Sequence, residues 1–231
     1  MIPICDTVRS RTFPLVNWLL IGANIFFFFV ELSLGRQTER FIYFFGLVPA
    51  RFFAESSLHE VLTLFSSMFL HGGWAHLFSN MLALYIFGDN VEDSMGHLGY
   101  LGFYLLCGLA AGATHLLFNP TSPLPSIGAS GAISGVLGAY LVLFPFAEII
   151  TLIPIFFIPW FIQIPAIFYL GIWFLSQLFN GTLAIVSEVQ ALGGIAWWAH
   201  AGGFIAGIFL APFYTRRRYR RRSYADEYWP W

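Results

Sequence analysis

Four polar side chains in this sequence have the types and spacing of a hydrolytic site. His76 and Asn80 are four residues apart, which places them on one face of a helix. Ser130 follows a proline-rich stretch, and His200 lies in a long apolar run. A serine hydroxyl becomes a nucleophile when a base takes its proton across about 2.6 to 3.2 Å. Ser130 and His200 are therefore predicted to form a nucleophile and general-base pair.

The same side chains include candidates for stabilising an oxyanion. Acyl transfer needs hydrogen-bond donors aimed at the charge that develops on the carbonyl oxygen. His76, Asn80 and the backbone N–H of Ser130 are the predicted donors, with His71 just ahead of them. Carboxylates are expected only near span ends, at Glu31, Asp89, Glu92, Asp93, Glu148 and Glu188. The sequence therefore predicts a Ser–His dyad without a third acidic member.

Glycines surround both predicted catalytic residues. Gly128, Gly131, Gly135 and Gly138 lie near Ser130, and Gly202, Gly203 and Gly207 lie near His200. Pairs of small residues four apart let two helices approach closely in a membrane. Gly128 and Gly131 are accordingly expected to support the site.

The composition indicates the solvent in which these residues work. The 231 residues are 58% hydrophobic and only 10% charged, which leaves too little polar surface for a water-soluble globule. A helix crosses about 30 Å of hydrocarbon with about 20 apolar residues. Six charge-poor runs of that size predict six transmembrane helices: Phe13–Leu34, Gly73–Asp89, Leu98–Phe118, Ile127–Phe146, Trp160–Phe179 and Ala191–Tyr214. The predicted fold class is an all-α membrane protein.

Depth within these spans brings the polar residues together. At about 1.5 Å per residue, His76, Ser130 and His200 each lie roughly 24 to 27 Å from the cytoplasmic end of their helix. All three are therefore predicted in one layer of the outer half of the bilayer.

The arginines predict the orientation. Lys is absent, and six of the eleven Arg lie between Arg216 and Arg222. Basic residues favour the cytoplasmic side, so both termini are predicted to be cytoplasmic. The expected organisation is a cytoplasmic N-terminus at residues 1–12, a membrane domain at 13–214 and a basic tail at 215–231. Val61–Leu70 is expected as an interfacial helix in the first external loop.

Plainer interpretations of the polar residues stay open at this point. Ser130 fits a glycine-rich packing face, His200 fits a hydrogen bond to a neighbouring helix, and Asn80 fits an interhelical tether. A zinc site is not expected, because His59-Glu60 is followed by Thr63 rather than a second His. No cofactor is expected. Nucleic acid is not an expected partner either, since the Arg block follows a span directly.

Three ordered motifs resemble those of the rhomboid intramembrane proteases. They are His71-Gly72-Gly73-Trp74-Ala75-His76-Leu77-Phe78-Ser79-Asn80, Gly128-Ala129-Ser130-Gly131 and Ala199-His200-Ala201-Gly202-Gly203. The resemblance implies that Ser130 is the nucleophile, that His200 is its base, and that His76 and Asn80 help hold the oxyanion. It covers about Phe13 to Tyr214 and implies a six-helix, rhomboid-like bundle.

The resemblance also implies a function and a location. The expected activity is that of a serine endopeptidase that cuts membrane-protein substrates in the bilayer of a prokaryotic cell membrane. The alternative is a non-proteolytic rhomboid-like protein that binds membrane clients, and intact Ser130 and His200 argue against it. A small-solute transporter is disfavoured because no spans show inverted repetition. The first external loop departs from the family, since Gly46 to Phe53 stand where many members carry a Trp-Arg pair.

Overall fold

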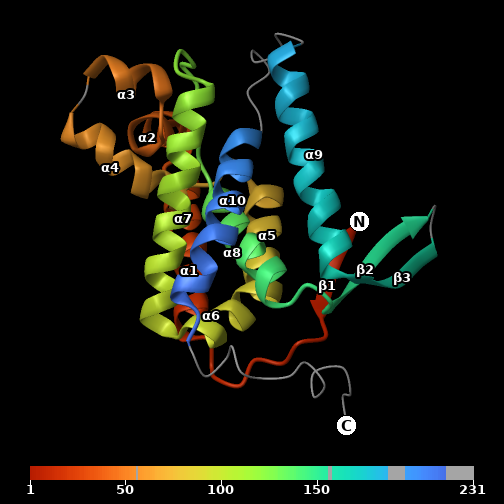
Figure 1. Cartoon of the computed structure of the whole chain (residues 1–231). Coiled ribbons are helices and arrows are strands. Elements are labelled where there is room, and N and C mark those ends of the chain that lie inside the picture. The colour runs from red at the N-terminus through yellow and green to blue at the C-terminus, as the bar shows by residue number, and fades with distance from the viewer. Residues whose placement is uncertain (56, 156–157, 187–195, 217–231) are drawn as a thin grey trace.

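A computed structural model describes residues 1–55, 57–155, 158–186 and 196–216 (Figure 1). Its elements are β1 (Ile2–Asp6), α1 (Leu15–Ser33), η1 (Gly35–Gln37), α2 (Thr38–Phe45), α3 (Pro49–Glu55), α4 (Leu58–Ser66), η2 (Ser67–Phe69), α5 (Trp74–Ala83), η3 (Leu84–Gly88), α6 (Asp89–Met95), α7 (His97–Phe118), α8 (Ser130–Leu143), β2 (Glu148–Ile155), β3 (Ile158–Pro165), α9 (Ala166–Val186) and α10 (Trp197–Tyr214). The turns η1 and η2 are 3₁₀-helical, and η3 is π-helical.

Three of the described helices are long and apolar enough to cross a membrane. They are α1, α7 and the Ala166–Ala184 part of α9. The first and third predicted spans match α1 and α7 with ends that differ by one or two residues. The fourth predicted span is shorter than expected, because α8 begins at Ser130 rather than Ile127. The start predicted for the sixth span, Ala191, lies outside the described residues, and α10 begins at Trp197.

The second predicted span continues beyond its expected end. The helix of α5 runs through η3 and α6 to Met95, and it stops at Gly96, whose φ is +76°. The Asn17 side chain of α1 explains the π-helical turn, because its Nδ2 donates to the Leu84 carbonyl at 2.8 Å. An inserted partner of this kind satisfies a backbone group that has left the regular ladder. The predicted end of this span at Asp89 was wrong, because the residues that follow Asp89 are buried and continue the helix as α6.

The described chain is mostly helical, but it is not all-α as expected. β1, β2 and β3 form a three-stranded antiparallel sheet in that order, with Ile2 opposite Leu152 and Glu148 opposite Pro165. The run that forms β2 and β3 is rich in β-branched and aromatic residues, which favours strands. Pro159 and Pro165 lie on the edge strand, where a missing N–H costs little. The fifth predicted span, Trp160–Phe179, therefore begins only at Ala166.

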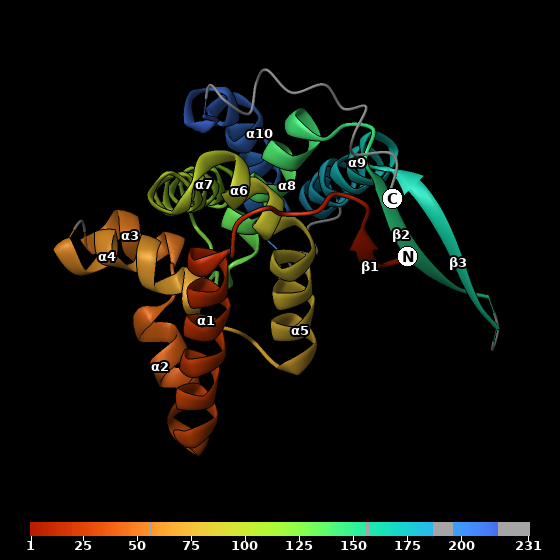
Figure 2. The ribbon, with the colours of Figure 1, turned by 90° about the horizontal axis from the view of Figure 1, so that it is seen from below.

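The segment before α5 forms a separate group of short helices. Figures 1 and 2 show α2, α3 and α4 on one side of the bundle, opposite the sheet. The helix expected at Val61–Leu70 is confirmed as α4 followed by η2. Arg51 organises this group, since its guanidinium pairs with Glu60 at 2.6 Å and donates to the carbonyls of Tyr43 and Gly46.

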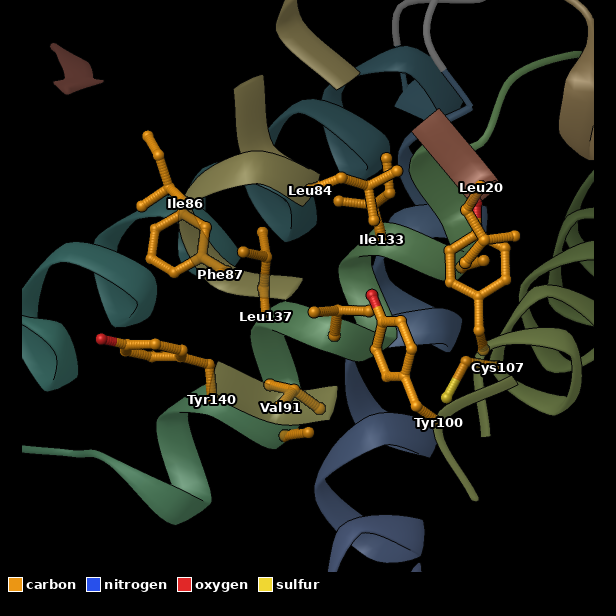
Figure 3. Close-up of a cluster of buried hydrophobic side chains, with 14 of the residues drawn as sticks. Leu20, Leu84, Ile86, Phe87, Val91, Tyr100, Cys107, Ile133, Leu137 and Tyr140 are labelled. Carbon is orange, nitrogen blue, oxygen red and sulfur yellow. The ribbon is translucent and has the colours of Figure 1, made fainter. Parts of the chain in front are cut away.

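The centre of the molecule is a three-helix core of α7, α8 and α10. A Cβ on Gly207 would lie 2.0 Å from the Gly135 carbonyl oxygen, so the α8 and α10 backbones touch. The glycine pairs therefore serve the close approach that the sequence predicts. Figure 3 shows the apolar cluster beside this contact, where η3, α6, α7 and α8 meet. The rings of Phe87 and Tyr140 pack edge to face there, 5.0 Å apart.

The segment before α1 and the residue that follows α10 reach the same end of the bundle. Thr12 donates its N–H and its hydroxyl to Asp93, and the Arg216 N–H donates to the Ser94 carbonyl. Because Asp93 and Ser94 are neighbours in α6, residues 12 and 216 lie on one side. Glu92 next to them accepts from two N–H groups of the first turn of α1, which has no capping side chain of its own.

Candidate active site

Ser130 and His200 form a direct hydrogen bond. The Ser130 Oγ lies 2.8 Å from the Nε2 of His200, although the residues are 70 positions apart. Ser130 is the first residue of α8 and His200 lies in the first turn and a half of α10. His200 is buried and Ser130 is half-buried, so the contact is partly sheltered from solvent. The distance is within reach for proton transfer from the hydroxyl to the imidazole.

The loop before α8 presents Ser130 at a helix start. Residues 119–129 are pinned by hydrogen bonds from Leu47 to Ser126 and from the Gly128 N–H to the Ser67 carbonyl. Gly128 has φ +121°, a conformation that L side chains rarely adopt. The first intrahelical bond runs from the Ile133 N–H to the Ala129 carbonyl, so the N–H of Ser130 belongs to the first turn. First-turn N–H groups lack intrahelical acceptors and can bind an anion.

His76 faces the space next to the serine. The Gly72 N–H points at His76 Nδ1 at 3.4 Å, so Nδ1 accepts and Nε2 carries the proton. A Cβ on Gly128 would lie 2.7 Å from this Nε2 and 3.6 Å from Ser130 Oγ. The glycine thus leaves room between a donor and the nucleophile. A reacting carbonyl oxygen needs a position of that kind.

Asn80 and His71 form the wall behind this space. Asn80 Nδ2 donates to His71 Nε2 at 3.0 Å, and both side chains are buried. Of the two hydrogens on Nδ2, this contact uses one. The His71 N–H in turn donates to both oxygens of Glu31, at 3.0 and 3.3 Å. Glu31 of α1 therefore holds the loop that leads into α5.

The supporting glycine Gly131 lies where α7 and α8 meet. A Cβ there would be 2.6 Å from the Ala111 Cβ of α7. The structure thus brings Ser130, His200, His76 and Gly128 together. Asn80, His71 and Gly131 line the same region from behind.

Two residues of this site were missed by the sequence reasoning. Gln177 Oε1 of α9 lies 2.9 Å from His200 Nδ1, and Glu31 was expected only as a span-end carboxylate. A polar side chain within an apolar span needs a hydrogen-bond partner. Gln177 in the charge-free α9 could therefore have been recognised as a candidate site residue. Its partner, however, is 23 residues away, and only the packing of α9 against α10 reveals it.

The site combines a hydroxyl, an imidazole and nearby N–H donors, which are the group types that acyl transfer uses. Within the part of the chain that the structure describes, no group of three or more His, Cys, Asp or Glu side chains is arranged to hold a metal ion.

Comparison with known protein families identifies the family of this chain. The family model of the Rhomboid domain matches residues 58–217, which contain Ser130, His200 and the His76–Asn80 pair. The chain belongs to the rhomboid family. Rhomboid proteins are integral membrane proteins, and the apolar helices described above fit that class.

Several rhomboid relatives are 29 to 36% identical to this chain over the aligned residues. The rhomboid protease GluP of Bacillus subtilis is 36% identical over 129 residues, which are 55% of this chain and 24% of that protein. RHOMBOID-like protein 5 of Arabidopsis thaliana is 32% identical over 64% of this chain and 42% of its own length. The mitochondrial rhomboid protein 1 of Saccharomyces cerevisiae is 29% identical over 72% and 47%. The chain thus spans less than half the length of these relatives.

Proposed function

We propose that this rhomboid protein is an intramembrane serine endopeptidase that cuts transmembrane proteins with a Ser130–His200 dyad. The observation that carries the proposal is the 2.8 Å hydrogen bond between Ser130 Oγ and His200 Nε2 inside a membrane bundle. The similarity to the rhomboid protease GluP supports it.

The reaction starts when His200 Nε2 takes the proton from Ser130 Oγ as the oxygen attacks the scissile carbonyl carbon. The negative charge moves to the carbonyl oxygen, which accepts hydrogen bonds from His76 Nε2–H, Asn80 Nδ2–H and the Ser130 N–H. His200 then gives its proton to the leaving amine. Water hydrolyses the acyl-enzyme with His200 as the base again.

The substrate is a membrane-protein segment that leaves its helical conformation at the cut. A helical peptide bond is closed in by its own side chains and hydrogen bonds, so its carbonyl is inaccessible. Segments with Gly or Pro near the cut are therefore preferred, because they unwind at lower cost.

The topology belongs to the same proposal. Six spans with both termini in the cytoplasm of a prokaryotic cell agree with the Arg9 and Arg11 pair and the Arg216–Arg222 block. The convergence of residues 12 and 216 on α6 supports an even number of spans. Single-cysteine labelling on either side of sealed vesicles tests this orientation.

A direct test of the function uses purified full-length protein in liposomes. Wild type is expected to cleave at least one of a panel of tagged single-span membrane proteins and to react with a fluorophosphonate probe at Ser130. The Ser130→Ala variant is expected to do neither and to keep its melting temperature. A folded wild type that binds the panel without cleavage or probe reaction overturns the proposal in favour of client binding.

A further inference from the structure

Gln177 of α9 contacts the ring nitrogen of His200 that faces away from Ser130. Its Oε1 lies 2.9 Å from His200 Nδ1, and the Gln177 side chain is 5% exposed. The two residues belong to different helices, so the bond joins α9 to the imidazole of α10. We propose that Gln177 is a positioning residue that fixes the tautomer and orientation of His200. This role rests on the proposed protease function.

The amide orientation follows from its other partners. Gln177 Nε2 donates to the Trp173 carbonyl at 3.1 Å and to Ser176 Oγ at 3.0 Å. A carbonyl only accepts, so the amide nitrogen must face Trp173. Oε1 is therefore the atom directed at His200, and an amide oxygen only accepts.

The tautomer of His200 follows in turn. Because Oε1 accepts, Nδ1 of a neutral imidazole carries the hydrogen, and Nε2 bears the free lone pair. Nε2 is the atom 2.8 Å from Ser130 Oγ, so the lone pair points at the proton that must be removed. The opposite tautomer would direct an N–H at the hydroxyl and leave the serine without a base.

The same face of α9 also limits the tilt of the ring. Trp173 precedes Gln177 by one helical turn, and its ring lies 6.0 Å from the His200 ring. Trp197 lies edge-on to the imidazole from α10 itself at 6.4 Å. Two aromatic rings thus pack near the imidazole, and Gln177 bonds to its Nδ1.

A neutral amide suits this position better than a carboxylate. A buried charge in a membrane span is costly, whereas an amide needs only hydrogen-bond partners. As His200 takes the proton in the transition state, the bond to Oε1 becomes charge-assisted and stronger. Its loss is therefore expected to lower kcat rather than to raise KM.

The first experiment compares three variants of the full-length protein on one cleaved substrate. Gln177→Met keeps the size of the side chain without an acceptor, and it is expected to lower kcat roughly 10- to 100-fold with KM unchanged. Gln177→Glu is expected to be more active than Gln177→Met but less active than wild type, because its oxygen accepts from Nδ1 while its charge is costly at this buried position. Asn180→Leu is the control, since Asn180 Nδ2 donates to the Ser176 carbonyl of its own helix. It is expected to match wild type.

The second experiment needs no activity. The protein is labelled with ¹⁵N-histidine, and the signals lost in His200→Gln are assigned to His200. In the Ser130→Ala variant, these signals are expected to report the Nδ1–H tautomer. In the same background, Gln177→Met is expected to shift them toward a mixture. Unchanged signals in Gln177→Met, or equal kcat in an active wild type and Gln177→Met, overturn the positioning role. A wild type that cleaves nothing contradicts the protease function instead, and the tautomer then still decides the role of Gln177.

Discussion

Gly203 of α10 lies against the backbone of Gly131 of α8, so that a Cβ on Gly203 would be 2.0 Å from the Gly131 carbonyl oxygen. Gly131 adjoins Ser130, and Gly203 is three residues after His200. The contact that brings the two helices together is therefore also the contact that sets the distance between nucleophile and base.

Gly203→Ala is expected to destabilise the protein by about 1 to 3 kcal/mol and to abolish cleavage, because a rigid carbonyl cannot make room for the methyl group. The measurements are thermal unfolding in detergent and substrate cleavage. Gly171→Ala on α9 is the matched control, since no atom lies within 4 Å of its Cβ position. Alanine there is expected to leave stability equal or slightly higher. Wild-type activity in Gly203→Ala would show that the α8 and α10 spacing is adjustable.

Ser130→Ala and His200→Ala are each expected to lower kcat by roughly 10⁴-fold or more, and the double variant is expected to be no worse than either single one. Members of one catalytic unit act together, so their losses are not additive. Single-turnover cleavage in liposomes gives the three rates. Losses that multiply would assign separate roles to the two residues and contradict the dyad.

Asn80→Ala is expected to lower kcat roughly 10- to 1,000-fold with a smaller change in KM, because one donor to the oxyanion is lost. The bond from Asn80 to His71 provides a rival explanation, namely a structural tether. Steady-state kinetics and a melting curve on the same preparation separate the two. A lower melting temperature with unchanged kcat would remove Asn80 from the site and leave Ser130 and His200 in place.

Asp6→Asn is expected to remove a pH dependence of stability. Burial raises the pKa of Asp6 from 3.8 to about 7, the Tyr140 hydroxyl opposes this rise by donating to the carboxyl, and the nearby Asp89 adds to it. The folded state therefore binds the proton more tightly than the unfolded state. As a result, the free energy of unfolding falls as pH rises from about 4 to about 7, and levels off above that range.

Melting temperatures of wild type and Asp6→Asn measured between about pH 5 and pH 8 test this expectation. The asparagine keeps an acceptor for Tyr140, and Asn90 next to it already donates to Asp6 at 2.9 Å. The variant is expected to gain on wild type as pH rises from about 5 to about 7, and to keep that gain without a further increase at about pH 8. Parallel curves would mean that Asp6 keeps an ordinary pKa in the folded protein.

The sequence by itself determined the membrane class and most residues of the candidate site, but not Gln177 or Glu31. Long charge-poor runs are read directly as spans, and α1 and α7 match them within two residues, because hydrocarbon thickness dictates length. The polar residues Ser130, His200, His76 and Asn80 were found from their cost in lipid and from their motifs. Their types are local information, and so is the glycine spacing that lets α8 and α10 touch.

Only the tertiary structure decided which partners these residues have. The strands β1 and β2 pair residues about 150 positions apart. The local sequence of either strand does not show which segment it will pair with. The same holds for Gln177 on His200 and for Glu31 on His71, which are separated by 23 and 40 residues. A polar side chain in an apolar run indicates that a hydrogen-bond partner is needed. A hydrogen bond, however, forms only when donor and acceptor lie about 3 Å apart. Which group lies within that reach depends on how the helices pack.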